Sequence, residues 1–176
     1  MNSLLEKTFS LLEGQRADLL SEIKKASNGK FNNRANNKWS ISQIAGHLIT
    51  AESLSVGYIN KKINAIKEVE NTGFFSEVKL WLFIVSQRLP IKYKAPKNLG
   101  DQPKAYPDVA SLEKDWNEVR QELKLLLDKF TNADLKKKIY RHPVMGRGNI
   151  IHALVFFREH IIHHWPQIRR QYLSDK

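Results

Sequence analysis

The segment from residue 107 to residue 130 has an apolar pattern typical of a helix in a bundle. Its large apolar residues recur after four, three, four, three and four positions: Leu112, Trp116, Val119, Leu123, Leu126 and Phe130. This spacing places all of them on one stripe of an α-helix, as in the seam between packed helices. Pro107 and Asp108 mark the start of this predicted helix, and residues 131–134 end it.

Two other segments carry apolar stripes at helical spacing, at residues 3–26 and 41–69, and a further long helix is predicted from residue 150 to about residue 172. The first stripe comprises Leu5, Phe9, Leu12, Leu19 and Ile23. The second comprises Ile41, Ile44, Leu48, Ala51, Leu54, Tyr58, Ile59, Ile63 and Ile66. Ser40 and Gln43 have the spacing of a capping box at the start of the second helix, and Asn149 is expected to cap the last one.

Residues 74–88 are rich in apolar and aromatic side chains, and we predict a further helix there. The apolar arc is too broad for a single packing face. It indicates either a nearly buried helix or a helix that a partner subunit covers.

The connections between these helices differ in length. Residues 90–107 hold four prolines and many lysines, and we expect a long irregular connection there. It is either a functional lid or a crossover that merely spans the bundle. Residues 135–148, with a proline and two glycines, are expected to be irregular. The whole chain, residues 1–176, is therefore predicted to be one all-α domain: a four-helix bundle with a long crossover loop and room for an extra short helix.

Composition limits the chemistry of the chain. It has no cysteine, which excludes disulfides and thiolate metal sites and leaves histidine as the only soft ligand. The net charge of +11 would attract polyanions, but the lysines are scattered and no nucleic-acid motif accompanies them, so nucleic acid is not the expected partner. Without a signal-peptide pattern or an apolar run of ~20 residues, we expect a cytoplasmic protein and no membrane partner.

Histidines indicate a metal site. His160 and His164 are four residues apart in the last predicted helix, so their side chains lie one turn apart on the same face. Two imidazoles placed in this way can bind one metal ion. His47 lies at the edge of the second apolar stripe and should point inward, although a lone inward histidine is more often a hydrogen-bonded core residue. The working hypothesis is a three-histidine site inside a helical bundle.

Two familiar metal motifs are excluded. A zincin needs a glutamate directly after the first histidine, where this chain has Ile161. A di-iron bundle needs a glutamate three residues before a histidine, and these positions hold Ile44, Phe157 and Ile161. A mononuclear site remains, suited to Zn²⁺, Ni²⁺ or Fe²⁺ and with at least one position open to water. The alternative is a metal ion that only ties two helices together.

The other histidines leave alternatives open. Pro166 removes a helical hydrogen bond and should kink the last helix, and if the kink turns His164 aside, His163 takes its place. His152 is expected to be structural. His142 precedes Pro143 in a predicted loop from which it could reach the mouth of the bundle.

Two motifs resemble those of a known family. Residues 39–49, WSISQIAGHLI, resemble the W-S-x-x-x-I-x-x-H-L signature of the DinB-like superfamily (damage-inducible protein B and its YfiT-like relatives). Residues 142–146, HPVMG, followed by residues 160–168, HIIHHWPQI, resemble its C-terminal signature. The resemblance implies an up-down-down-up four-helix bundle, often a homodimer, and one divalent metal ion held by His47, His160 and His164. It implies no DNA-repair chemistry.

The resemblance also suggests functions. Some relatives use low-molecular-weight thiols such as bacillithiol or mycothiol to transfer or isomerise substrates, and others are described as metal-dependent hydrolases. We therefore expect a divalent-metal-binding protein that acts on a small molecule, as a hydrolase or as a thiol-dependent transferase with a thiol cofactor. A non-catalytic helical scaffold and a polyanion-binding protein are the alternatives. The sequence assigns no catalytic residue.

Overall fold

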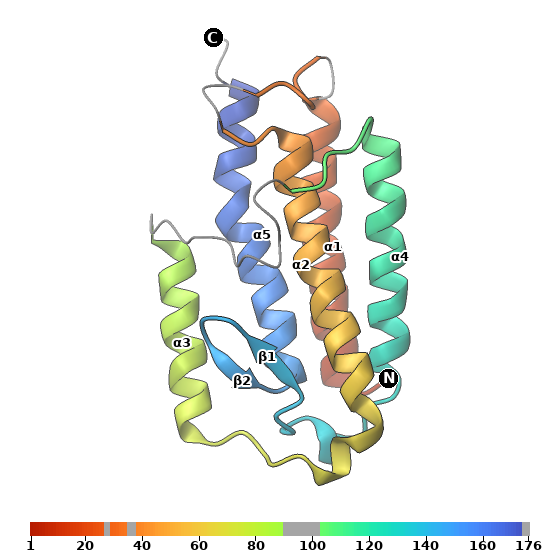
Figure 1. Cartoon of the computed structure of the whole chain (residues 1–176), viewed down its shortest axis with the longest axis vertical. Helices are drawn as coiled ribbons and strands as arrows, with labels where there is room; N and C mark the ends of the chain where they lie inside the picture. The colour runs from red at the N-terminus through yellow and green to blue at the C-terminus, as the bar shows by residue number, and fades with distance from the viewer. Residues whose placement is uncertain (27–28, 35–37, 90–102, 174–176) are drawn as a thin grey trace.

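Four long helices stand side by side in the computed structural model, which describes residues 1–26, 29–34, 38–89 and 103–173 (Figure 1). They are α1 (Ser3–Lys25), α2 (Ile41–Lys62), α4 (Val109–Leu127) and α5 (Ile150–Leu173). α1 and α5 run in one direction, and α2 and α4 run in the other. Contacts join α1 to α5, α5 to α2, α2 to α4 and α4 to α1. The predicted up-down-down-up bundle is confirmed.

A fifth helix, α3 (Phe74–Arg88), packs against α5 at the edge of the bundle (Figure 1). It is the extra helix for which the sequence left room. The prediction that it is nearly buried is wrong, because Phe75 is 80 % exposed and Trp81 is 61 % exposed. Only the side with Phe83 and Gln87 is buried.

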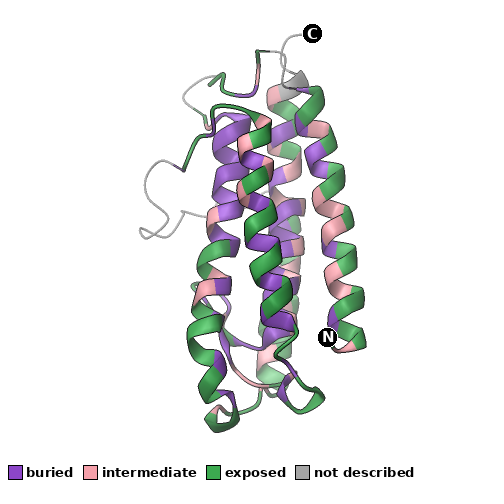
Figure 2. Cartoon of the chain, turned by 90° about the vertical axis from the view of Figure 1, so that its right-hand side faces the viewer, coloured by how far each residue is buried: buried purple, intermediate pink, exposed green. Residues whose placement is uncertain are grey.

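The core lies along the faces that the four long helices turn toward one another. Figure 2, which views the molecule from the side of α4, shows the buried residues on these inner faces and the exposed ones facing outward. All six residues of the predicted α4 stripe are buried. On α2, however, Leu54 and Tyr58 are exposed, because the buried face turns toward α4 and includes Glu52 and Val56 instead.

The predicted helix starts are confirmed. Ser40 and Gln43 form a capping box, in which the Gln43 amide donates to Ser40 Oγ and the Ser40 amide donates to Gln43 Oε1. The Asn149 side chain accepts a hydrogen bond from the His152 amide at the start of α5. A 3₁₀ helix, η1 (Ile63–Glu68), continues α2 toward the predicted end of its apolar stripe.

The segment that was expected to be irregular contains a β-hairpin instead. After the short 3₁₀ helix η3 (Asn132–Asp134), β1 (Tyr140–His142) pairs antiparallel with β2 (Gly146–Gly148). Gly146 has a φ of 80°, a conformation that glycine adopts without strain. Strands of three residues are too short to leave an alternating apolar pattern in the sequence.

Most of the predicted crossover loop, residues 90–102, lies outside the described residues, so its two interpretations stay predictions. Its end, residues 103–107, is described and packs on α2, as shown below. Within the described part of the chain, no helix is both long enough and apolar enough to span a membrane.

Candidate metal centre

Three buried histidines from two helices meet between α2 and α5. His47 lies in the second turn of α2, where the capping box at Ser40 determines how the helix begins. Its Nε2 atom is 3.1 Å from Nε2 of His160, and Nε2 of His164 is also 3.1 Å from Nε2 of His160. Each of the three residues is at most 8 % exposed. These residues, here called the histidine cluster, are the set predicted from the sequence, brought together with one nitrogen each toward a common point.

The hydrogen-bonding capacity of the cluster fits a cation. His164 Nδ1 lies 3.1 Å from Gln167 Oε1, and in a neutral ring it donates its hydrogen there, which leaves a lone pair on Nε2. A single hydrogen on His160 Nε2 cannot satisfy its short contacts to both neighbouring rings. The Nδ1 atom of His160 is buried without a hydrogen-bond partner. A cation that accepts all three Nε2 lone pairs removes this conflict, so the residues present fit a divalent metal ion.

The surroundings keep these imidazoles neutral. Burial lowers the pKa of His47 to about 4, and nearby His163 adds to the effect. Burial and the neighbouring His47 lower the pKa of His164 to about 3, and burial holds the pKa of His160 well below its ordinary value. At neutral pH each imidazole is therefore uncharged and has a ring-nitrogen lone pair to offer, which is the state that a metal requires.

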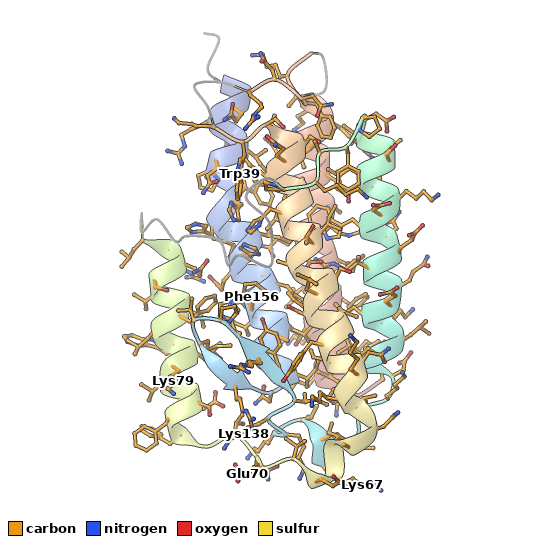
Figure 3. All side chains as sticks on the ribbon, viewed as in Figure 1. Trp39, Lys67, Glu70, Lys79, Lys138 and Phe156 are labelled. Carbon is orange, nitrogen blue, oxygen red and sulfur yellow. The ribbon has the colours of Figure 1, made fainter. Side chains whose placement is uncertain are left out.

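Aromatic rings flank the cluster. The Trp39 ring centroid is 5.3 Å from that of His47, and the Phe156 ring stacks on His160 at 5.0 Å with an interplanar angle of 22°. Figure 3 labels Trp39, which precedes α2, and Phe156, which belongs to α5; the two lie at different heights in the bundle. These rings exclude water from part of the cluster and restrict how the imidazoles can turn.

The remaining histidines have other partners. His163 Nδ1 lies 2.9 Å from the carbonyl oxygen of Gln87 on α3, and α5 continues past Pro166 to Leu173. The alternative in which His163 replaces His164 is therefore not the observed arrangement. His152 pairs with Glu77 of α3, with 3.0 Å between Nε2 and Oε1, as suits a structural residue.

His142 is not part of the cluster. Its Nδ1 accepts hydrogen bonds from the amides of Val144 and Met145, so the ring closes the hairpin turn. The ring packs against Phe83 and Phe156, and burial lowers its pKa to about 4. The sequence left the position of His142 open, and the structure places it in the hairpin, packed against Phe83 of α3 and Phe156 of α5.

One group that supports the site was missed by the sequence reasoning. Glu159, directly before His160, is fully buried and accepts hydrogen bonds from Arg88 of α3 and from Arg158. Although burial acts in the opposite direction, the two guanidinium groups hold the pKa of Glu159 below its usual value. This ion pair and the contact of His163 with Gln87 attach the end of α3 to α5 beside the cluster. The dipeptide Glu159–His160 does not by itself indicate in the sequence that the glutamate forms a buried ion pair beside the cluster.

The end of the crossover packs on α2 next to His47. A Cβ atom on Gly46 would lie 2.0 Å from the backbone oxygen of Lys104, so only glycine allows this approach. Ser42, one turn earlier, exchanges hydrogen bonds with the backbone of Tyr106. The described end of the crossover is therefore attached to the same helical turns that carry His47.

Replacing Gly46 tests this attachment. We expect Gly46→Ala to lower the free energy of unfolding by about 1–3 kcal/mol, because the new methyl group displaces the backbone at Lys104. Gly57 on the same helix is the control: nothing lies within 4 Å of its Cβ position, so Gly57→Ala should raise stability by about 0.5–1 kcal/mol. Thermal or urea unfolding measures both, and equal effects of the two substitutions would contradict the close packing.

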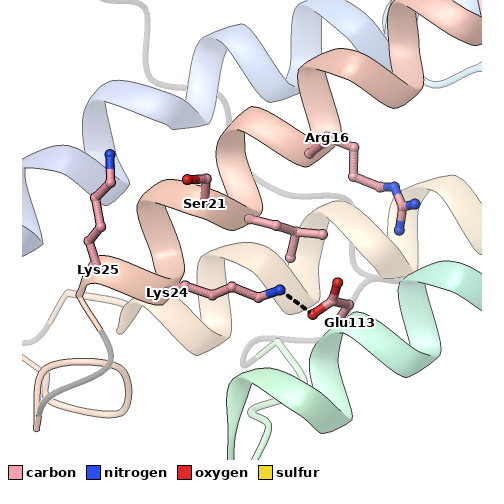
Figure 4. Close-up of a pocket in the computed structure, with 7 residues that line it drawn as sticks. Arg16, Ser21, Lys24, Lys25 and Glu113 are labelled. Atoms are coloured by element: carbon pink, nitrogen blue, oxygen red, sulfur yellow. Dashed lines mark ion pairs between the residues drawn. The ribbon is translucent and has the colours of Figure 1, made fainter.

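Some basic side chains elsewhere have partners within the fold. In the densest lysine run, Lys138 pairs with Glu70 and Lys137 donates to the carbonyl of Val69. A groove of about 580 Å³ between α1 and α4 is crossed by an ion pair of 2.7 Å between Lys24 and Glu113 (Figure 4). Its lining residues do not include any member of the histidine cluster.

Comparison with known protein families identifies a match. The family model described as the DinB superfamily matches residues 11–168, which include the whole histidine cluster. No curated protein and no solved structure matches the chain.

Proposed function

The chain belongs to the DinB superfamily, and we propose that it is a cytoplasmic metal-dependent enzyme that acts on a small molecule. His47, His160 and His164 would hold one divalent ion, zinc, nickel or iron. The observation that carries the proposal is the convergence of three neutral, buried Nε2 atoms from two helices. A closed structural zinc site needs a fourth protein ligand, and among the described residues no further histidine or carboxylate joins the group.

The chain's own residues prepare the site for catalysis. Gln167 orients the His164 ring, and the capping box positions the first turns of α2 beneath His47. Trp39 and Phe156 shield the cluster from water on the sides that they cover. When bound, a divalent ion would supply Lewis-acid activation of a water molecule, a thiol or a substrate oxygen.

Between the two expected reactions, the surroundings favour thiol transfer. Among the described residues, the carboxylate nearest in sequence to a cluster histidine is Glu159, and it is fully paired with two arginines. It is therefore unsuited to act as a general base. A thiol has a pKa of about 8.5 and needs little help to ionise at neutral pH, whereas water starts from about 15.7. We propose a transferase that uses a low-molecular-weight thiol, with hydrolysis as the competing outcome.

Metal content tests the site. We expect about one divalent ion per chain in the wild type and a loss of affinity of more than about 100-fold in His47→Ala or His160→Ala, because each removes one of three ligands. His163→Gln is the matched control on α5 and should retain the metal. Elemental analysis and competition with a chelator measure the effect, and full occupancy in His47→Ala would refute the site.

Activity tests the reaction. Metal-loaded protein should conjugate a small electrophile with bacillithiol, cysteine or a related thiol, and the rate should vanish on metal removal and return when the ion is restored. His160→Ala should not recover under the same treatment. Cleavage of ester or amide substrates without a thiol would support hydrolysis instead. A metal-loaded protein inactive in both screens would favour a scaffold.

A further inference from the structure

The ring of His142, the last residue of β1, carries a hydrogen-bond donor that the described part of the fold does not use. His142 Nδ1 lies 3.2 Å from the backbone nitrogen of Val144 and 3.2 Å from that of Met145, and it accepts a hydrogen bond from each. A neutral imidazole that accepts at one ring nitrogen carries its hydrogen on the other. The hairpin turn therefore determines the tautomer and leaves Nε2 as a donor that points away from the turn.

The packing around His142 preserves this state. Phe83 of α3 and Phe156 of α5 lie against the ring, with centroids 4.8 and 4.5 Å from that of His142. Burial lowers the pKa of His142 to about 4, so the imidazole is uncharged at neutral pH. The Nε2–H group is therefore a neutral donor held in one orientation.

Among the described residues, none accepts a hydrogen bond from His142 Nε2. Only 8 % of the residue is exposed, but Nε2 is not sealed from solvent. Polar groups buried to this extent are almost always hydrogen-bonded, to the protein, to water or to a ligand. A small molecule can reach this donor and supply an acceptor.

The donor lies beside the histidine cluster. The Phe156 ring that touches His142 also stacks on His160, with 5.0 Å between the centroids. The rings of His142 and His160 are thus no farther apart than these two centroid distances added together. Burial is the main cause of the lowered pKa of His160, and His142 is among the imidazoles that add to it. A small organic molecule bound at the cluster can span such a distance.

A second polar group lies at the same seam between α3 and α5. Gln87 follows Phe83 by one helical turn on the buried side of α3 and is 7 % exposed. Its backbone carbonyl contacts His163, but within the described ranges its side-chain amide has no hydrogen-bond partner and is not sealed from solvent. A few polar groups placed among aromatic side chains are typical of the part of a ligand site that fixes orientation.

We propose that His142 binds the substrate of the metal centre by donating from Nε2 to an uncharged oxygen atom, with the Gln87 amide as a second polar contact. The inference rests on the proposed thiol transferase. Neither group is charged, so the pair suits a carbonyl oxygen better than a carboxylate or a phosphate, for which arginine and lysine are the usual partners. Because His142 lies close to His160, the substrate class is an electrophile with a carbonyl near the carbon that the thiol attacks.

Two substitutions separate substrate binding from the structural role of the ring. In His142→Asn, the side-chain oxygen takes the place of Nδ1 and can still accept from the turn, but nothing replaces the Nε2–H group. In His142→Gln, the amide nitrogen takes the place of Nε2, whereas the acceptor for the turn is lost. If the ring only closes the hairpin, His142→Asn should be the better tolerated change. If it binds substrate, His142→Gln should be.

Two alkyl iodides measure the contact with the carbonyl. Iodoacetamide and iodoethane both release iodide as the thiol sulfur bonds to carbon and the thiol proton passes to solvent, but only iodoacetamide has a carbonyl. The chain has no cysteine that either reagent could modify. With metal-loaded protein and bacillithiol, we expect His142→Asn to lower the preference for iodoacetamide in kcat/KM about 10-fold, mainly through KM, as for the loss of one hydrogen bond. His142→Gln should retain most of the preference, and metal content should be the same in both variants and the wild type.

A binding measurement decides the inference even if the protein is inactive with both iodides. Acetamide, an unreactive analogue of iodoacetamide, should shift the NMR resonance of His142 Nε2–H in the wild type with zinc added. The absence of this resonance in His142→Asn assigns it. No shift with acetamide, or a preference kept in His142→Asn and lost in His142→Gln, would overturn the inference. A shift with acetamide in a protein that alkylates no thiol would overturn only the proposed reaction.

Discussion

Replacing Glu52 with alanine is expected to lower the free energy of unfolding by about 3–5 kcal/mol, the cost of breaking a buried ion pair. Glu52 on α2 is 1 % exposed and accepts two hydrogen bonds from Arg120 of α4, at 2.8 and 2.9 Å. Trp116 donates a third at 2.9 Å. The variant would leave the Arg120 guanidinium, which is 2 % exposed, with only Glu13 at 3.2 Å. Urea unfolding measures the loss.

A double variant separates the ion pair from the volume that it fills. With Glu52→Met and Arg120→Met together, no charge remains uncompensated, so we expect most of the lost stability to return. Glu13 keeps Arg16 as its partner, at 2.8 Å. The loss of stability in the double variant is compared with the losses in Glu52→Met and Arg120→Met measured separately. If it equalled the sum of those two losses, the pair would contribute through packing alone.

The histidine cluster could be predicted because its information is local. The spacing of His160 and His164 on one helix determines that they share a face, and His47 shares the inward face of its own helix. The apolar periodicity of α1 and α4 was equally readable, since a helix that packs on one side repeats its core residues every three or four positions. Both kinds of signal are contained within a single element.

The features that the sequence did not reveal depend on pairs of elements. Glu52 and Arg120 are 68 positions apart, and each alone reads as a surface residue. Their ion pair lies on the face of α2 that packs against α4, whereas Leu54 and Tyr58 lie off that face and are exposed. The hairpin at residues 140–148 was missed for a related reason, because its strands are stabilised by packing against α2 and α5 rather than by their own pattern.

Acidification should destabilise the metal-free protein strongly. Burial lowers the pKa of His47 and His142 to about 4 and that of His164 to about 3, whereas an unfolded histidine has a pKa of about 6.5. The unfolded chain therefore binds protons first as the pH falls. The stability present above pH 6.5 is lost toward pH 4, by roughly 2–3 kcal/mol per group at pH 4.5. Three such groups approach the total stability of a typical domain, about 5–15 kcal/mol.

The melting temperature in a chelator should thus fall by roughly 20 °C between pH 6.5 and pH 4.5. His142→Phe tests the cause, because it removes one buried titrating group outside the cluster and keeps an aromatic ring against Phe83 and Phe156. Whatever its effect at pH 7, its melting temperature should depend less steeply on pH. Zinc should stabilise the wild type at pH 7, and this gain should vanish in acid, because protons compete for the same Nε2 lone pairs. Parallel pH profiles for wild type and variant would show that other groups cause the acid sensitivity.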